Sequence, residues 1–298
     1  MMEKLQQMPG QLPTLWEGWM PPTREHYDLI LTAFQWGYLV TGSIQWVIGW
    51  YGMGKTSTPS LLNIPGRWAW LTMESPGFLT LGYLMGKMSH GDLPWQNKVL
   101  AALFVMHYAY RAVAFPFLQP SMAPVHVFVW LAALGFQVLN ATCLGSWLAA
   151  YGPVHDADWD DVPLSTPRFV VGVAVFYLGL ASNYFHDEEL REIRRRERRR
   201  QDDVAARSGT APALVRGHYR IPEAGLFRYV LFAHYLCEWV EWSGFWLAAG
   251  WSCAPARAFL VNEIAAMLPR AVRGKAWYRE HFGEDKIRKK YAVIPGVI

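Results

Sequence analysis

The feature that most constrains this sequence is an apolar run that continues without a break into a basic arm. Phe169 to Leu180 (FVVGVAVFYLGL) could lie in lipid, and the segment REIRRRERRR follows shortly after it. No Pro or Gly interrupts the passage between them, so one helix is predicted to run from the apolar part into the charged part. On such a helix, residues spaced by four, four and three positions share one stripe. The polar residues of that stripe are Asn183, Asp187, Arg191 and Arg194.

The composition agrees with a membrane protein. Apolar residues make up 52% of the 298 residues and charged residues only 17%, whereas a soluble domain has about 25% charged residues. A helix needs about 20 mostly apolar residues to cross a bilayer. This criterion predicts an all-α, polytopic membrane protein with seven transmembrane helices. The predicted spans are 28–51, 69–87, 98–118, 123–150, 167–185, 224–250 and 252–272.

The charges of the loops predict the orientation. The basic arm has seven arginines against two glutamates, whereas the acidic loop 155–161 (HDADWDD) has four aspartates and no Lys or Arg. Because cytoplasmic loops carry the Lys and Arg excess, the arm is predicted to be cytoplasmic and the acidic loop to lie on the far side. With seven spans, the N-terminus is then lumenal, and the C-terminus, which contains KIRKK, is cytoplasmic.

The domain organisation is predicted to be simple. An N-terminal segment, 1–27, lacks the continuous apolar core of a signal peptide. Residues 28–298 form one membrane domain with no separate soluble domain. The three cysteines all lie in apolar stretches and form no metal-type pair, so they are predicted to be buried free thiols. They are Cys143, Cys237 and Cys253.

One motif is rejected on its context. Gly49 to Thr56 (GWYGMGKT) matches the GxxxxGK[ST] pattern of a phosphate-binding loop. That loop requires a strand before it and a helix after it. Here a predicted span precedes the pattern, and Pro59 and Pro65 follow it, so a phosphate-binding loop of that type is not expected.

Ionisable residues occur inside four of the predicted spans. Each is costly in lipid and therefore tends to face a cavity or a partner. Together they predict a polar pocket within the bundle. These residues are Glu74 in the second span, His107 and Arg111 in the third, His234, Glu238 and Glu241 in the sixth, and Arg270 and Arg273 at the cytoplasmic end of the seventh.

Two chemistries could use this pocket. A Glu and His cluster at helical spacing can hold iron in a membrane oxygenase, but the other histidines make no matching pairs, and no metal is predicted. The alternative is an organic cofactor, whose phosphates the arginines would bind. An acidic residue beside arginines on the 183–194 stripe is typical of dinucleotide binding, although no GxGxxG follows a strand here.

Several longer segments resemble the steroid 5α-reductase family. NYFHDEELREIR, YRIPEAGLFRYVLFAHYLCEWVEW, RAVRGKAWY and IRKKYAVIP are similar to the C-terminal half of that family. RWAWLTMESP, which contains Glu74, and HYAYR, which contains Tyr108, resemble its two N-terminal signatures. The resemblance covers most of the chain after the first span and is dense over 181–298.

The resemblance implies a function and a location. The fold would have seven spans, with NADPH binding mainly to the C-terminal half, about 167–298, and a flat apolar substrate in the membrane. The reaction would be NADPH-dependent reduction of the Δ4 double bond of 3-oxo steroids to 5α-steroids, the activity of a 3-oxo-5α-steroid 4-dehydrogenase. The expected setting is the endoplasmic reticulum membrane, with the protein a monomer in contact with lipid and not with nucleic acid.

The resemblance also implies site residues. Glu74 and Tyr108 match the catalytic pair that binds the 3-keto oxygen and stabilises the enolate, and Trp70 matches a wall of the steroid site. The positions that match cofactor-binding residues are Asn183, Asp187, Arg191, Arg194, Tyr219, His234, Glu238, Arg270 and Tyr278.

The sequence departs from the family at several positions and leaves other functions open. Gly274 and Lys275 replace family histidines, and His234 stands where Asn is usual. Met73 and Leu144 occupy positions that hold Gln in animal members. The alternatives are an enoyl-thioester (very-long-chain enoyl-CoA) reductase, an isoprenylcysteine-type methyltransferase, and a non-catalytic sterol-binding protein.

Overall fold

The computed structural model describes residues 17–160, 165–208 and 219–298. These residues are mostly helical, and the one sheet among them is a two-residue antiparallel pair, β1 with β2. The elements are α1 (Arg24–Val47), the 3₁₀ turn η1 (Gly54–Thr56), β1 (Asn63–Ile64), α2 (Gly66–Met88), α3 (Trp95–Tyr108), the π-helical turn η2 (Ala109–Ala114), α4 (Phe115–Leu118), β2 (Val125–His126), α5 (Val127–Ser146), the π-helical turn η3 (Trp147–Tyr151), α6 (Asp156–Asp160), α7 (Ser165–Ser208), the 3₁₀ turn η4 (Gly225–Arg228), α8 (Ala233–Ala249), α9 (Ala254–Phe282) and α10 (Glu284–Ile287).

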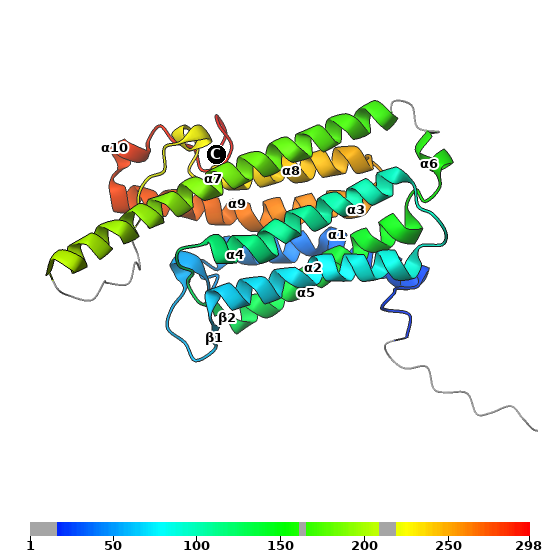
Figure 1. The fold of residues 1–298 in the computed structure, drawn as a ribbon, viewed down its shortest axis with the longest axis horizontal. Coiled ribbons are helices and arrows are strands. Elements are labelled where there is room, and N and C mark those ends of the chain that lie inside the picture. The colour runs from blue at the N-terminus through cyan, green and yellow to red at the C-terminus, as the bar shows by residue number, and fades with distance from the viewer. Residues whose placement is uncertain (1–16, 161–164, 209–218) are drawn as a thin grey trace, which may run out of the picture.

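Long helical segments occupy the positions of all seven predicted spans and run side by side as a bundle (Figure 1). Three of them are long and apolar enough to cross a membrane: Trp95–Leu118, Val127–Tyr151 and Ser165–Ser208. The protein is therefore a helical membrane protein, while crossing by the other four helices stays a prediction. Two of those four helices differ from a simple apolar span in a clear way. Helix α8 has only 17 residues, and α9 contains several charged side chains.

The predicted continuous helix is confirmed. Residues 165–208 form the single helix α7, which has 44 residues. At 1.5 Å per residue it is about 66 Å long, roughly twice the hydrocarbon thickness of a bilayer. Its basic half must therefore extend beyond the membrane, and Figure 1 shows it projecting past the end of the bundle.

Several helix boundaries differ from the prediction, among them the end of the first span, the start of the sixth and the end of the seventh. The first span was expected to reach residue 51, but α1 ends at Val47 because Arg273 of α9 donates hydrogen bonds to its last carbonyl groups, including that of Trp46 at 2.6 Å. The sixth was expected to begin at residue 224, but α8 begins at Ala233. The preceding segment instead bonds to the C-terminal strand-like residues, with the Leu231 amide donating to the Tyr291 carbonyl at 2.9 Å. The seventh continues beyond 272, to Phe282.

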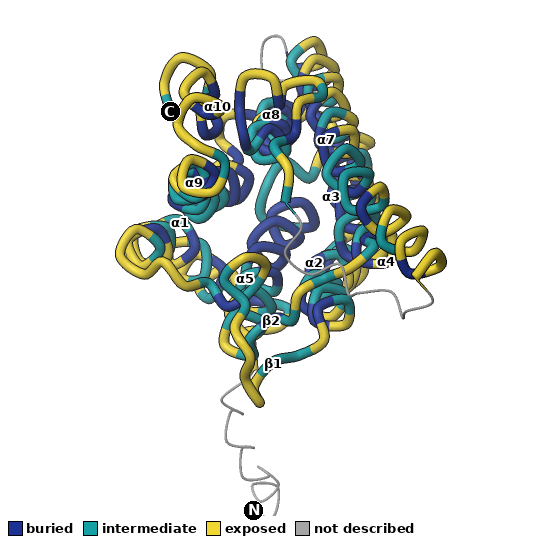
Figure 2. The backbone as a smooth tube through the Cα atoms, turned by 90° about the vertical axis from the view of Figure 1, so that its left-hand side faces the viewer, coloured by how far each residue is buried: buried dark blue, intermediate teal, exposed yellow. Residues whose placement is uncertain are grey.

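Glycines bring α7 and α8 into backbone contact. A Cβ on Gly179 of α7 would lie 2.3 Å from the Glu241 amide nitrogen of α8, and one on Gly244 of α8 would lie 2.3 Å from the Phe176 nitrogen. Such small residues allow membrane helices to approach closely. In the end-on view of Figure 2, α7 and α8 lie together, with α3 beside α7. This close pairing sets the positions of the charged residues on both helices.

The core centres on aromatic side chains of α3, α8 and α9. Trp242 is buried, and its ring lies 4.5 Å from Phe259, 4.7 Å from His107 and 6.0 Å from Phe104, measured between centroids. The three cysteines are buried and free, as predicted. Of the predicted N-terminal segment 1–27, positions 1–16 lie outside the described residues, as does Asp161 of the acidic loop.

Candidate functional site

A change of helix type positions the polar residues of the third predicted span. After α3, the turn η2 is π-helical. A π turn accommodates one more residue than an α turn and often occurs at functional sites, because it rotates the side chains that follow it. His107 and Tyr108 lie just before η2 and are buried, and Arg111 lies within it with its side chain 13% exposed. All three side chains are thus directed into the bundle.

Arg111 joins three helices through its guanidinium group. Its Nη1 lies 3.3 Å from Asp187 Oδ2 of α7, and its Nη2 lies 3.6 Å from Glu238 Oε2 of α8. The Tyr110 hydroxyl donates to the same Asp187 oxygen at 3.3 Å. Buried charges are tolerated where such partners are present. Two predicted cofactor residues on different helices, Asp187 and Glu238, therefore meet at one arginine.

A second polar contact, between a histidine and two carboxyl groups, lies beside the first. His107 Nδ1 is 2.7 Å from Glu241 Oε1, and its Nε2 is 3.9 Å from Glu238 Oε1. Both carboxylates are on α8, one turn apart, so the helical spacing of Glu238 and Glu241 places them on the same side. Ionisable residues of the third and sixth predicted spans thus meet within the bundle, where they contact one another in a network. Among the described residues no group of three His, Cys, Asp or Glu side chains is placed to hold a metal ion.

The predicted stripe of α7 faces the interior. Asn183, Asp187 and Arg191 are 3%, 4% and 0% exposed. Asn183 Nδ2 donates to the His234 carbonyl at 3.2 Å, and Arg191 Nη1 donates to the Tyr110 hydroxyl at 3.1 Å. Several buried polar atoms here have no partner. They are Asn183 Oδ1, Arg191 Nη2 and His234 Nδ1.

The residues expected at the substrate, Trp70, Glu74 and Tyr108, lie on α2 and α3, and Gln137 of α5 lies beside them. Glu74 Oε2 accepts a hydrogen bond from Gln137 Nε2 at 2.5 Å. Gly77 lies next to both Gln137 and Tyr108, since a Cβ there would be 2.7 Å from Gln137 Oε1 and 3.7 Å from the Tyr108 ring. Trp70 Nε1 donates to the Arg111 carbonyl at 3.0 Å. Trp70 therefore connects this group to the Arg111 network.

The remaining predicted cofactor residues form a second group, near the end of α1 and the loop that follows it. They are Arg194, Tyr219, Arg270 and Tyr278. Tyr219 and Tyr278 flank the side chain of Lys55, whereas Arg270 is turned toward α1, with its Nε donating to Gln45 Oε1 at 2.8 Å. Arg194 Nη1 donates to Gln119 Oε1 at 3.3 Å. Arg273, predicted for the pocket, instead caps α1. The nine predicted cofactor positions are thus distributed over two neighbouring groups.

Several residues of these groups were missed from the sequence. Gln137 and Gln119 carry no local motif that assigns them to a site, and Lys55 belongs to a phosphate-loop pattern that was rejected on its context. Each is separated from its partner by dozens of residues. Glu263 of α9 has a buried carboxylate oxygen, Oε2, without a partner. An apolar span that contains a lone Glu or Gln was the available signal for two of them.

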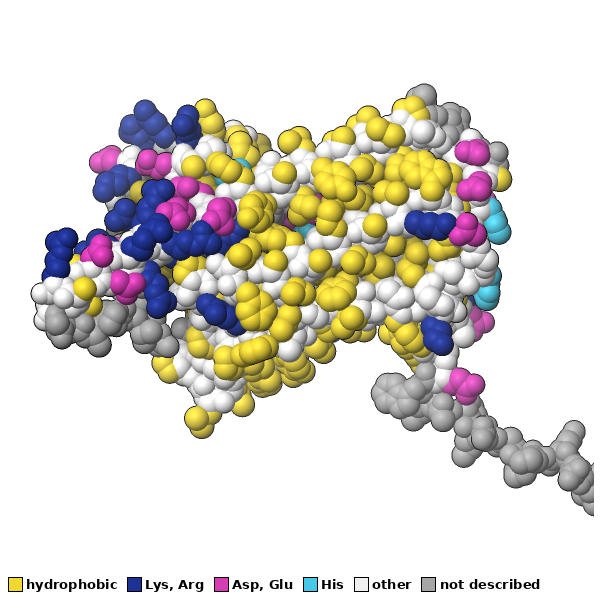
Figure 3. Space-filling model, viewed as in Figure 1, with side chains coloured by type: hydrophobic (Ala, Val, Ile, Leu, Met, Phe, Trp, Pro, Cys, Tyr) yellow, Lys and Arg dark blue, Asp and Glu magenta, His cyan; other side chains and the backbone are white. Residues whose placement is uncertain are grey.

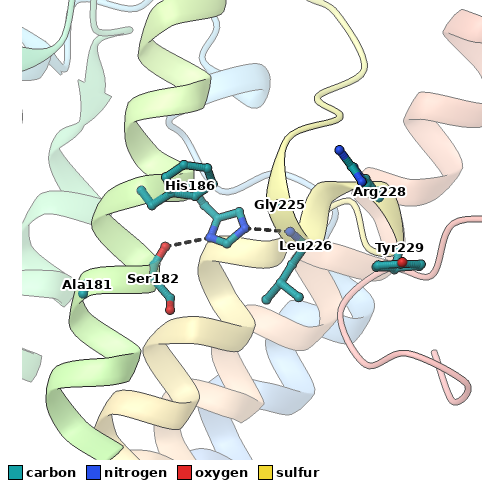
Figure 4. A pocket seen from close by; sticks show the side chains of 8 residues that line it. Ala181, Ser182, His186, Gly225, Leu226, Arg228 and Tyr229 are labelled. Carbon is teal, nitrogen blue, oxygen red and sulfur yellow. Dashed lines mark hydrogen bonds between the residues drawn. The ribbon is translucent and has the colours of Figure 1, made fainter.

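A separate pocket opens between α7 and η4. It has a volume of about 760 Å³, and its lining residues include His186, Leu226 and Tyr229 (Figure 4). His186 Nδ1 donates to the Ser182 carbonyl at 2.6 Å, and its Nε2 accepts from the Leu226 amide at 3.0 Å. Because both ring nitrogens are satisfied, His186 connects η4 to α7. None of the predicted site residues lines this pocket.

The fold and the buried network define a class of protein, a helical membrane protein with a charged interior. Comparison with known proteins gives the family. The family model described as 3-oxo-5-alpha-steroid 4-dehydrogenase matches residues 123–209 and 212–298. The chain belongs to the 3-oxo-5-alpha-steroid 4-dehydrogenase family.

Individual relatives cover most of the chain. The bovine (Bos taurus) 3-oxo-5-alpha-steroid 4-dehydrogenase 1 is 32% identical, over 81% of this chain and 85% of its own length. The tomato (Solanum lycopersicum) steroid 5-alpha-reductase DET2 is 31% identical, over 82% and 86%. A Schizosaccharomyces pombe protein, named only as uncharacterized protein C9.08c, is 34% identical over 78% and 84%. Membership of this family supports an oxidoreductase that acts on steroids.

Proposed function

We propose that this protein reduces the Δ4 double bond of a 3-oxo steroid to a 5α-steroid with NADPH. The observation that carries the proposal is the convergence of a carboxyl group, an amide and a phenol near Gly77, beside an arginine network on α7 and α8. The first group suits a ketone oxygen, and the second suits an anionic cofactor. Family membership supports both assignments.

The chemistry required of the protein is modest. Tyr108 would donate a hydrogen bond to the 3-keto oxygen, and a protonated Glu74 would donate a second. Donors that are already in place stabilise the negative charge that develops on that oxygen during reduction. Gln137 supports this arrangement because it holds one Glu74 oxygen and leaves the other for the substrate. Trp70 would contribute an apolar wall.

The residues on α7 and α8 suit a nicotinamide dinucleotide. Their unpartnered buried atoms include a donor, Arg191 Nη2, and an acceptor, Asn183 Oδ1, which a polar ligand could satisfy. When bound, NADPH would supply the hydride. The residues that would hold it are Asn183, Asp187, Arg191, Arg194, Tyr219, His234, Glu238, Arg270 and Tyr278.

We further propose the setting already expected from the sequence. Residues 28–298 would act as one seven-span membrane domain, monomeric and surrounded by lipid, in the endoplasmic reticulum. Its N-terminus would be lumenal and its C-terminus cytoplasmic. The concentration of Lys and Arg at one end of the bundle supports this orientation (Figure 3).

The test is turnover by the purified full-length protein with NADPH and progesterone or testosterone, followed by product analysis. We expect the 5α-reduced product. Glu74→Gln and Tyr108→Phe should each lower kcat by about 100-fold or more, the scale of losing one preorganised donor. Tyr83→Phe is the matched control, because Tyr83 lies on α2 with its side chain exposed.

Three other results would contradict the proposal. Reduction of a trans-2-enoyl thioester without turnover of any Δ4-3-ketosteroid would identify an enoyl-thioester reductase. Binding of S-adenosylmethionine in place of NADPH would identify a methyltransferase. Failure to consume NADPH with any enone, together with retained sterol binding, would identify a non-catalytic sterol-binding protein.

A further inference from the structure

The lysine of the rejected phosphate-loop pattern lies against an aromatic wall. Lys55 belongs to the turn η1, which follows helix α1 and not a strand, so the pattern does not form a phosphate-binding loop of the usual type. Gly54, with φ +55°, turns the chain just before it. Lys55 Nζ lies 3.8 Å from the centroid of the Trp277 ring, 4.2 Å from Tyr278 and 5.1 Å from Tyr219. The lysine side chain remains exposed on its open side.

This lysine has no acidic partner among the described residues, and neither does its neighbour Arg194. The one hydrogen bond of the Arg194 side chain to a described residue goes to the neutral Gln119 side chain, at 3.3 Å. Arg194 is also close enough to Lys55 to repel its charge. Two cations therefore lie near the same aromatic group without an acidic partner among the described residues. Such an arrangement is unfavourable until an anion binds.

We propose that Lys55 and Arg194 form a binding site for a phosphate monoester, the one that distinguishes NADPH from NADH. The inference rests on the proposed function, because it assigns one end of the proposed cofactor. Trp277 and Tyr278 would contact the apolar part of the nucleoside that carries the phosphate. Lys55 would donate to the phosphate oxygens from the loop that follows α1.

The charges of the neighbouring arginines favour a monoester at this place. Arg111 is paired with Asp187 and Glu238, and Arg191 is paired with Glu188 at 2.7 Å. Those arginines are largely neutralised and suit groups of low charge. Lys55 and Arg194 are not neutralised by described residues, and a phosphate monoester carries about −1.5 to −2 charges near neutral pH. The most strongly charged group of the cofactor thus meets the two unpaired cations.

The site also predicts a pH dependence. The loss of solvation among the three rings, with the nearby charge of Arg194, lowers the pKa of Lys55 to about 7. The groups that face it are Arg194 of α7, Tyr219, and Trp277 and Tyr278 of α9. Only the protonated lysine attracts phosphate, so binding should weaken as the pH rises above 7. The phosphate itself is already mostly dianionic there, because its second pKa is about 6.

The experiment compares the dissociation constants of NADPH and NADH for the purified full-length protein and three variants. Lys55→Met should weaken NADPH binding about 10- to 100-fold, the size of a lost charge-assisted hydrogen bond, and should change NADH binding less than about twofold. Lys55→Arg should keep most of the NADPH preference and lose the weakening between pH 7 and 9. Lys98→Met, which removes a lysine paired with Asp92 at 2.6 Å, is the control.

Two outcomes would overturn the inference. Equal changes for both cofactors in Lys55→Met, or no change in either, would show that Lys55 does not bind the distinguishing phosphate. Lys55-dependent binding to phosphatidylserine vesicles with unchanged NADPH affinity would assign the cations to a lipid headgroup. Binding is measured without a steroid, so a Lys55-dependent preference for NADPH in a protein that reduces no ketosteroid would support the inference and reject only the proposed reaction.

Discussion

Gln137 orients the carboxyl group on which the proposed chemistry depends. Its Nε2 lies 2.5 Å from Glu74 Oε2, while its own Oε1 is buried without a partner. A buried carboxyl group that loses such a donor must rotate or be left unsatisfied, at a cost of about 1–3 kcal/mol. Gln137 therefore acts on the substrate through Glu74 and is a positioning residue.

At this scale we predict that Gln137→Leu lowers kcat for ketosteroid reduction about 10- to 100-fold, because Glu74 is no longer held toward the ketone. The NADPH KM should be nearly unchanged, since the cofactor residues lie on other helices. Steady-state kinetics with varied NADPH and varied steroid measure both quantities.

The matched control is Gln96→Leu. Gln96 is also buried, lies at the start of α3, and has an unpartnered side-chain oxygen. This variant should keep the wild-type kcat. An equal loss of kcat in both variants would mean that Gln137 contributes only to general stability.

At the scale of elements, the contact between α7 and α8 determines the site. Gly179 lies against the Glu241 backbone, and Glu241 is the partner of His107. The same contact keeps Asp187 and Glu238 within reach of one arginine. If α7 and α8 moved apart by the width of one methyl group, the distances from Arg111 to Asp187 and Glu238 could not both be kept.

We predict that Gly179→Ala destabilises the protein by about 1–3 kcal/mol, the usual cost of overpacking, because its Cβ would lie 2.3 Å from the Glu241 nitrogen. The Tm of the detergent-solubilised protein should fall, and activity should fall with it.

Gly82→Ala provides the comparison within α2. A Cβ there has no neighbour within 4 Å, and replacing a helical Gly by Ala stabilises by up to about 1 kcal/mol. Its Tm should be equal or higher. If the Tm of Gly179→Ala matched that of Gly82→Ala, the close contact between α7 and α8 would not exist in solution.

The whole molecule is divided along its long axis. Figure 3 shows an apolar band between one end rich in Lys and Arg and another end that carries Asp, Glu and His side chains. The basic end contains the second half of α7, and the acidic end contains α6. This distribution agrees with a protein that spans a bilayer with its basic end in the cytoplasm.

We predict that cysteines introduced at the two ends are labelled from opposite sides of sealed microsomes. Arg199→Cys on α7 should react with a membrane-impermeant maleimide added outside, and Asp160→Cys on α6 should react only after the membrane is opened. The native cysteines give little background because all three are buried. Labelling of Asp160→Cys from outside would reverse the proposed orientation.

The sequence by itself determined the features that depend on residues close along the chain. The helical spacing of Asn183, Asp187, Arg191 and Arg194 predicted one stripe. The structure buries the first three and leaves Arg194 half-buried. The unbroken helix from the apolar run into the basic arm followed from the absence of Pro and Gly between Leu180 and Arg200. Similarity to the family was readable from short segments for the same reason, and the family model matches residues 123–209 and 212–298.

Only the tertiary structure decided which distant residues meet. Lys55 approaches Trp277 and Tyr278, Gln137 holds Glu74, and Arg273 ends α1 early. No local pattern encodes these contacts, because each depends on how two helices or a loop pack against one another. Packing is set by the sum of many weak contacts and close backbone approaches across the bundle. This packing places Lys55, a lysine of a rejected motif, beside Trp277 and Tyr278, where we propose that it binds phosphate.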